Sequence, residues 1–261
     1  MPVSSAAKKP EPASLPPAAP DGLFAGTSGW AYATWKPGFY PANVSSKKFL
    51  SFYASQMNSV EVNYTFRALP TPKMLAEWLA ATGEGFRFSF KAPQRITHFS
   101  RLRDCEGQVT DLLTALQPVG DAGRLGPLLF QLPPNFKLDL DRLRGFLSIS
   151  ALKEKKIAFE FRHESWFAPE VFALMTEFGA ALCIAESDDL ASPEVHTAPA
   201  HTCFRLRRNG GYTDAELAEF VAKFADLTDA GREVYAYFKH EDEPTGALNG
   251  AALLRMAVAA G

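Results

Sequence analysis

The sequence predicts an α/β fold, a single closed barrel of eight parallel strands surrounded by helices, the (β/α)8 or TIM barrel. Eight short apolar segments of strand type alternate, in most cases, with segments of helical periodicity over about 240 residues. Polar or charged residues stand at the ends of these strands, where barrel proteins carry their function. The alternative, a doubly wound open sheet, expects G-x-G-x-x-G after the first strand, whereas this chain has GTSGW there.

Composition places the chain among ordinary soluble globular proteins. It has 261 residues, of which 47% are hydrophobic and 21% charged, with a net charge of −2. A chain of this length forms one large domain with a sizeable core. The chain has no excess of basic residues, so nucleic acid is only weakly supported as a partner. No apolar run approaches the roughly 20 residues that a membrane span needs.

The three cysteines have spacings that do not suit a metal site. They are Cys105, Cys183 and Cys203, and no export signal accompanies them. An odd number of cysteines without such a signal predicts reduced thiols in a cytoplasmic protein. Because Cys183 and Cys203 lie within apolar strand segments, we expect them to be small core residues.

The first 22 residues form a segment of their own. Pro, Ala and Ser dominate it, and it lacks the apolar stretch of a secretory signal. Such a segment buries too little apolar surface to fold, which predicts a disordered tail over 1–22 and a barrel domain over 23–261.

Alternation of apolar and polar side chains predicts the strands. In chain order they are Leu23–Thr27, Ser59–Tyr64, Phe86–Lys91, Pro127–Leu132, Ile157–Arg162, Ala180–Ala185, Thr202–Arg207 and Glu233–Lys239. The seventh places Arg205 and Arg207 on one face, and the eighth does the same with Tyr237 and Lys239. Two prolines close the fourth strand just after Gln131.

Apolar residues at helical spacing predict the helices between the strands. In chain order they are Ser46–Met57, Thr71–Ala81, Gln108–Leu116, Leu140–Leu147, Pro169–Phe178, Asp214–Phe224 and Ala247–Val258. Thr71, followed by Pro72, and Thr213 are typical residues for starting a helix.

The segment IAFEFRHESW, residues 157–166, carries the densest chemistry. Glu160, Arg162 and His163 lie within four residues at the end of an apolar strand, where ionisable groups need partners or a ligand. One interpretation is a buried ion pair between Glu160 and Arg162 that stabilises the barrel interior. The other is an anion-binding or acid–base site.

Two loops can likewise be interpreted either as structural segments or as parts of a ligand site. The aromatic loop after the first strand contains Trp30, Tyr32 and Trp35; we favour a lid packed over the barrel end, and the alternative is a stacking wall for a planar or sugar-like ligand. The basic loop APQRITHFSRLRD is expected to be solvated, with a phosphate-attracting rim as the less favoured interpretation.

In a barrel, the carboxyl ends of all strands meet at one face. The residues expected to gather there are Glu61, Asn63, Lys91, Gln131, Glu160, Arg162, Glu186, Arg205, Tyr237 and Lys239.

Several motifs, in order, resemble one known family. They are GTSGWAYATW, FYP, VEVNYTF, FSFKAP with ITH, LLFQLPP and EFRHESW. This set is similar to the DUF72, or YecE-like, family from about Leu23 to the C-terminus. The resemblance implies a TIM barrel but no established reaction; metal-dependent endonucleases share this architecture at the level of the fold only.

Three positions depart from the pattern of that family. The seventh strand ends in Arg205-Leu206-Arg207-Arg208 where an Arg-Leu-His-Gly-like end is common, and the eighth ends in Phe238-Lys239-His240-Glu241 where Phe-Asn-Asn-Asp is common. The sixth-strand Asp position corresponds to Glu186. Added positive charge at Arg207 and Lys239 favours an anionic ligand over a divalent metal.

The sequence supports a ligand site more firmly than a reaction. The favoured function is binding of, or action on, a small anionic or phosphorylated molecule. The expected catalytic residues are Glu160, Arg162, His163, Glu61 and Lys91, and the expected substrate-binding residues are Trp30, Tyr32, Asn63, Gln131, Arg205, Tyr237 and Lys239. Metal-assisted phosphodiester hydrolysis is the first alternative, with Glu61, Glu160, Glu186 and His163 as candidate ligands, and a non-catalytic binding module is the second. No resident metal or cofactor is assigned.

Overall fold

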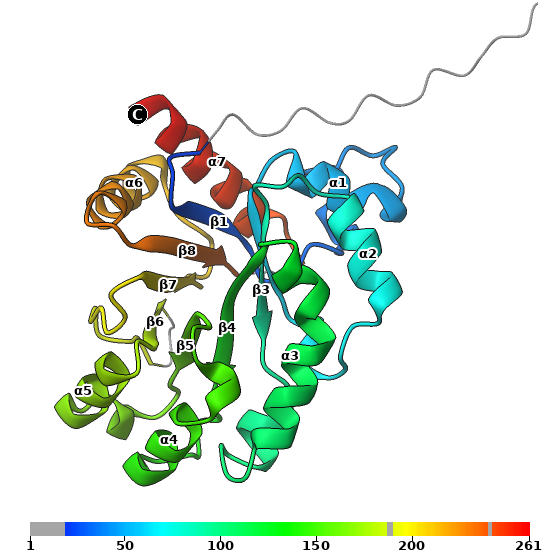
Figure 1. Ribbon diagram of the computed structural model, residues 1–261. Helices are drawn as coiled ribbons and strands as arrows, with labels where there is room; N and C mark the ends of the chain where they lie inside the picture. Colours follow the sequence, from blue (N-terminus) through cyan, green and yellow to red (C-terminus); the bar gives the residue numbers. More distant parts are fainter. Residues whose placement is uncertain (1–18, 187–189, 240–241) are drawn as a thin grey trace, which may run out of the picture.

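The computed structural model describes residues 19–186, 190–239 and 242–261. Eight strands lie side by side at the centre and helices surround them (Figure 1). The strands are β1 (Leu23–Thr27), β2 (Ser59–Val62), β3 (Arg87–Lys91), β4 (Leu125–Gln131), β5 (Ile157–Glu160), β6 (Ala181–Glu186), β7 (His201–Leu206) and β8 (Glu233–Phe238).

Seven α-helices occur in the described part of the chain. They are α1 (Phe49–Ala54), α2 (Pro72–Ala80), α3 (Glu106–Asp121), α4 (Leu140–Leu147), α5 (Pro169–Glu177), α6 (Asp214–Asp229) and α7 (Thr245–Ala260). Both predicted helix starts are confirmed. The Thr71 side chain accepts a hydrogen bond from the backbone of Met74, and Thr213 forms a reciprocal capping box with Glu216.

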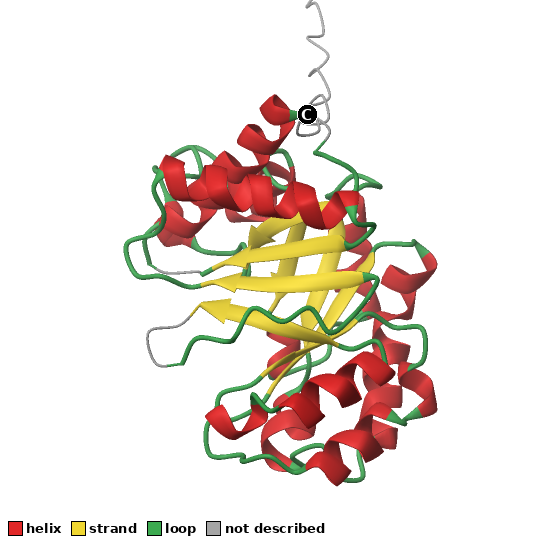
Figure 2. Cartoon of the chain, turned by 90° about the vertical axis from the view of Figure 1, so that its left-hand side faces the viewer, coloured by secondary structure: helices red, strands yellow, loops and turns green. Residues whose placement is uncertain are grey.

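The strands confirm the (β/α)8 barrel rather than an open sheet. Their order is β1-β8-β7-β6-β5-β4-β3-β2, every neighbouring pair is parallel, and a bridge between Ser28 and Glu61 joins the two ends. In Figure 2 the arrowheads of the strands point to the same side. The carboxyl ends of the strands therefore share one face, as the sequence predicts.

Side chains complete the junction between β1 and β2. The side-chain amide of Asn58 accepts a hydrogen bond from the Ala25 N–H at 2.9 Å and donates one to the Leu23 carbonyl at 2.8 Å. The Tyr53 hydroxyl accepts from the Thr27 N–H at 2.7 Å and donates to the Ser59 carbonyl at 2.9 Å. These groups satisfy backbone atoms that a neighbouring strand would otherwise bond.

The apolar core has two parts. The larger lies between the outer faces of the strands and the helices, and includes Phe159 and Phe161 of the segment 157–166. The smaller fills the barrel interior and consists of Leu129, Ala158, Ala181, Cys183, Ala198, Cys203, Tyr235 and Tyr237. Cys183 and Cys203 are thus core residues, as predicted.

The structure corrects several predicted boundaries. β2 ends at Val62, because the chain then enters a helical turn, Tyr64–Phe66. β5 pairs only as far as Glu160, so Arg162 lies beyond the ladder. Helix α3 continues past Pro118 to Asp121, although proline removes one backbone donor, and the buried Val119 packs its last turn onto the core.

Of the predicted tail, residues 1–18 lie outside the described residues. Ala19 packs against the core, and the Pro20 carbonyl accepts a hydrogen bond from Leu23 at 3.1 Å. The contacts of the barrel domain therefore begin a few residues before β1. Within the described ranges, no helix has both the length and the apolar character that crossing a membrane requires.

Candidate functional site

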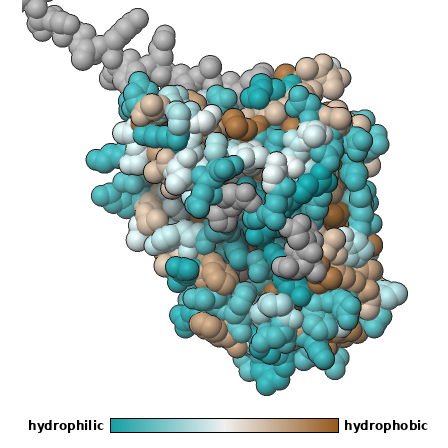
Figure 3. Space-filling model, turned by 180° about the vertical axis from the view of Figure 1, so that it is seen from behind, coloured by the Kyte–Doolittle hydropathy of each residue, from teal (hydrophilic) through white to brown (hydrophobic). Residues whose placement is uncertain are grey.

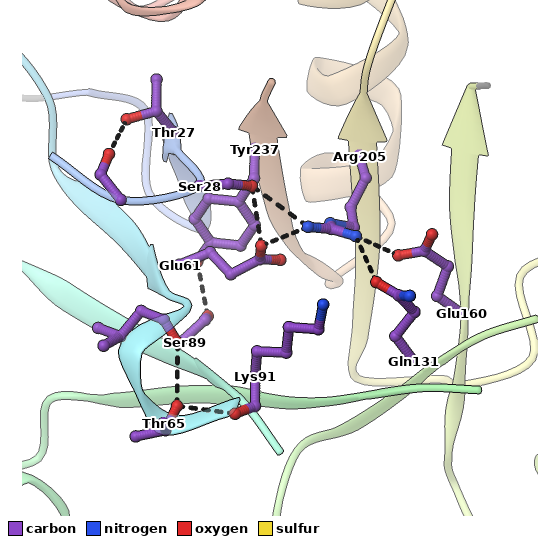
Figure 4. Close-up of polar contacts among 12 residues, drawn as sticks. Thr27, Ser28, Glu61, Thr65, Ser89, Lys91, Gln131, Glu160, Arg205 and Tyr237 are labelled. Carbon is purple, nitrogen blue, oxygen red and sulfur yellow. Dashed lines mark hydrogen bonds and ion pairs between the residues drawn. The ribbon is translucent and has the colours of Figure 1, made fainter. Parts of the chain in front are cut away.

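Polar side chains from five strands and one loop meet inside the carboxyl end of the barrel. They are Ser28, Glu61, Lys91, Gln131, Glu160 and Arg205 (Figure 4). We call this end of the barrel interior the mouth. The view from behind in Figure 3 looks onto the carboxyl ends of the strands, and hydrophilic atoms gather around the middle of that face.

Arg205 lies at the centre of the mouth. Its guanidinium pairs with the Glu61 carboxylate, Nη2 to Oε1 at 2.7 Å, and also with the Glu160 carboxylate. All three residues are at most 2% exposed. Burial alone would lower the pKa of Arg205, but Glu160 and Glu61 raise it above its ordinary value. Arg205 therefore stays protonated and connects β2, β5 and β7.

Glu160 has two cationic partners. Besides Arg205 it pairs with Arg162, whose side chain is 17% exposed. Burial raises the pKa of Glu160, yet Arg205, Arg162 and Arg207 together hold it below its ordinary value of 4.5. The prediction of a buried ion pair between Glu160 and Arg162 is confirmed. The second partner is Arg205, which the sequence assigned to substrate binding instead.

Two further cations lie beside this network. Burial lowers the pKa of Lys91 to about 8, with contributions from Arg205 and Arg207, while Glu61 and Glu160 oppose the change. Burial and Arg205 also lower the pKa of Arg207. Within the described ranges, neither the Lys91 amine nor the Arg207 guanidinium has a hydrogen bond or an ion pair.

Charge in the mouth is therefore unbalanced. Among the described residues, four cations, Lys91, Arg162, Arg205 and Arg207, face two carboxylates, Glu61 and Glu160. The sequence placed Arg207 on the same strand face as Arg205 and counted its charge in favour of an anionic ligand, but did not include it among the site residues. Its position two residues after Arg205, on the same face of the strand, was the signal that could have placed it in the site.

The aromatic loop covers one side of the mouth. The Tyr32 hydroxyl donates to the Ser28 carbonyl at 3.0 Å, and burial together with Glu61 raises its pKa to about 12. Trp30 packs edge to face on Trp78, with ring centroids 5.2 Å apart. Trp35 is completely buried, whereas Trp30 and Tyr32 remain partly exposed. The loop therefore packs against the core beside the mouth and leaves Trp30 and Tyr32 partly exposed.

Two other predicted site residues, Tyr237 and His163, form hydrogen bonds outside the ion-pair network of the mouth. The Tyr237 hydroxyl bonds Ser59 and Ser89 at 2.7 and 2.6 Å in the barrel interior. His163 caps a short helical turn through the Ser165 N–H. Tyr237 thus belongs to a hydrogen-bond network of the interior, and His163 acts as a helix cap.

Asn63 and Lys239 belong to the surroundings of the mouth. Asn63 starts the turn after β2, and its side-chain oxygen is buried with no hydrogen-bond partner among the described residues. The Lys239 amine donates to Asn209 at 2.8 Å on the exposed rim. The neighbouring departures, His240 and Glu241, lie outside the described residues.

Glu186 does not join the buried network. Its carboxylate pairs with Arg208 at 2.9 Å. The side chain of Glu186 is 35% exposed and that of Arg208 is 41% exposed. Glu186 also accepts a hydrogen bond from Tyr212. The strand alternation explains this placement, because Ala185, not Glu186, shares the inward phase of Cys183.

The carboxylates of the mouth offer little to a metal ion. Glu61 and Glu160 are both bonded to Arg205, and over residues 19–186, 190–239 and 242–261 no three His, Cys, Asp or Glu side chains are grouped to hold one. The donor set of the mouth instead suits an anion, because guanidinium and ammonium groups are in excess.

Comparison with known proteins agrees with the barrel. A family model described as "Protein of unknown function DUF72" matches residues 24–261. The UPF0759 protein YecE of Escherichia coli is 35% identical over 147 residues, which cover 56% of this chain and 50% of that protein. The UPF0759 protein YunF of Bacillus subtilis is 27% identical over 161 residues, covering 60% and 56%. The chain matches about half the length of these curated relatives.

Solved structures show the same fold. A DUF72 family protein from Thermotoga maritima superposes with a TM-score of 0.77 at 23% identity, covering 90% of this chain and 98% of that one. An AP endonuclease of family 2 from Brucella melitensis gives a TM-score of 0.51 at 11% identity, covering 90% and 98%. At these identities the likeness concerns the fold alone. The match over residues 24–261 identifies the chain as a member of the DUF72 family.

Proposed function

We propose that this protein binds a small molecule carrying a phosphate or carboxylate group at the mouth of its barrel. The observation that carries the proposal is the excess of cations there. Arg205 is neutralised by two carboxylates, and Arg162 shares one of them, whereas Lys91 and Arg207 have no such partner among the described residues.

An anion between these groups would stabilise them. Besides burial, Arg205 lowers the pKa of both Lys91 and Arg207, which means that the like charges repel one another. A bound anion relieves this repulsion, and a guanidinium can hold phosphate or carboxylate through two parallel hydrogen bonds. The carboxyl end of a barrel is also where ligands of this fold bind.

The residues have distinct roles in this proposal. Arg207, Arg162 and Lys91 contact the anion, while Arg205 holds Glu61 and Glu160 in place. Trp30 and Tyr32, in the aromatic loop, contact the remainder of the ligand. Binding without turnover and metal-assisted phosphodiester hydrolysis remain as outcomes that experiment distinguishes, and no observation favours the second.

Thermal unfolding in phosphate tests the proposal. We expect inorganic phosphate to raise the melting temperature above that in chloride at equal ionic strength, because a ligand that binds only the folded state stabilises it. Arg207→Gln should lose most of this increase. The control is Arg255→Gln on the exposed face of α7, which should keep it. Equal melting in phosphate and chloride, or an increase of the same size in Arg207→Gln, would contradict the proposal.

A further inference from the structure

Lys91 places its amine at the mouth, where it forms no ion pair or hydrogen bond with the residues that the structure describes. It is the last residue of β3, and its Nζ atom lies 4.3 Å from the centroid of the Phe66 ring. In Figure 4 the amine points into the group formed by Glu61, Gln131 and Arg205. Its position gives it access to a ligand held in the mouth.

The surroundings of Lys91 disfavour its protonated form. Among the described residues, the charged or titratable groups around it are Arg205 from β7, Arg207 just after that strand, Glu61 from β2, Glu160 from β5 and His98 from the helical turn after β3. Burial has the largest effect, the two arginines add to it, and the carboxylates oppose it. A lysine that served only to attract anions would gain by staying charged, whereas this environment makes the neutral, nucleophilic amine accessible near neutral pH.

We propose that Lys91 forms a Schiff base with a carbonyl compound that carries a phosphate or carboxylate group, an inference that rests on the proposed anion site. The neutral amine attacks the carbonyl carbon, and the carbinolamine then loses its hydroxyl group as water. One neutral amine, one carbonyl and one proton from solvent give one protonated imine and one water, so no oxidant or reductant is needed.

The positions of the other groups suit this step. Arg207 and Arg162 would hold the anionic group of the substrate, which fixes the distance of its carbonyl carbon from the amine. The protonated imine carries the same single positive charge as a protonated lysine. Glu61 and Glu160, fixed by Arg205, therefore compensate the imine as they compensate the ammonium ion.

Reductive trapping tests this inference on the full chain. The protein is incubated with pyruvate or dihydroxyacetone phosphate and treated with cyanoborohydride, which reduces an imine to a stable secondary amine. Peptide mass spectrometry then locates the adduct. We expect at least tenfold more adduct at Lys91 than at the exposed Lys73 of α2, and a rate that rises as pH increases through about 8.

Two variants complete the test. Lys91→Arg keeps a positive charge but has no nucleophilic amine, so it should abolish the adduct, whereas Lys73→Arg should label like the parent. Labelling spread evenly over surface lysines, or no labelling, overturns the inference. If phosphate still stabilises the parent, only the Schiff base fails; if phosphate has no effect either, the anion site fails with it. If Lys91→Arg does not fold, the amounts of adduct at Lys91 and Lys73 in the parent protein still test the inference.

Discussion

The Nη2 atom of Arg205 lies 2.7 Å from Oε1 of Glu61, and the two side chains are 3% and 2% exposed. The residues are far apart in sequence and come from β7 and β2. Because the same guanidinium also pairs with Glu160 of β5, it spans the barrel interior and neutralises two buried carboxylates at once. The mouth is thus both a structural brace and a candidate binding site.

Replacing Arg205 should destabilise the protein strongly. Arg205→Met leaves two buried carboxylates without their shared partner, and breaking a buried pair typically costs about 3–5 kcal/mol. Urea unfolding measures the change. The control is Arg144→Met, which breaks an ion pair with Glu177 whose members are 50% and 55% exposed, and should cost about 0–1 kcal/mol. Equal losses in the two variants would show that the buried network does not brace the barrel.

Glu160 should make the stability depend on acid pH. Its pKa in the folded protein lies below the ordinary 4.5, because Arg205, Arg162 and Arg207 outweigh burial. A carboxyl group of this kind contributes stability above its unfolded pKa and loses it as pH falls toward the folded value. The unfolding free energy of the parent should therefore fall below about pH 4.5, and that of Glu160→Gln should fall less steeply. Identical slopes between pH 5 and pH 3 would assign the acid sensitivity to other groups.

Gly26 should be essential for the closure of the barrel. A Cβ atom at this position would lie 1.8 Å from the Ser59 carbonyl oxygen, so Gly26→Ala must push β1 away from β2 and disturb the bonds of Tyr53 and Asn58. We expect a loss of about 1–3 kcal/mol or more.

The matched control for Gly26 lies in helix α4. At Gly145 an added Cβ meets no atom within 4 Å, so Gly145→Ala should stabilise by about 0.5–1 kcal/mol through its helix propensity. Denaturant midpoints of both variants check the contrast. A Gly26→Ala protein as stable as the parent would mean that the seam between β1 and β2 tolerates separation.

The alternation of side chains determined much of the site from sequence alone. It puts Phe159 and Phe161 on one face of their strand and Glu160 on the other; in the structure the two phenylalanines pack in the larger core and Glu160 faces the interior. The rule is local, because successive side chains of a strand point to opposite faces whatever lies around them. The same local chemistry predicted the starts of α2 and α6 at Thr71 and Thr213.

Which inward residues meet depended on the closed barrel. From the sequence, both Tyr237 and Arg205 are predicted to bind the substrate. In the structure the Tyr237 hydroxyl bonds Ser59 and Ser89 in the barrel interior. The Arg205 guanidinium forms ion pairs with Glu61 and Glu160. Alternation tells which way a side chain points but not its height along the barrel. That height follows from the stagger of neighbouring strands, which is a property of the whole sheet. The sequence therefore determined the fold and the inward set of residues, and only the tertiary structure decided which of them pair and which cations have no ion pair among the described residues.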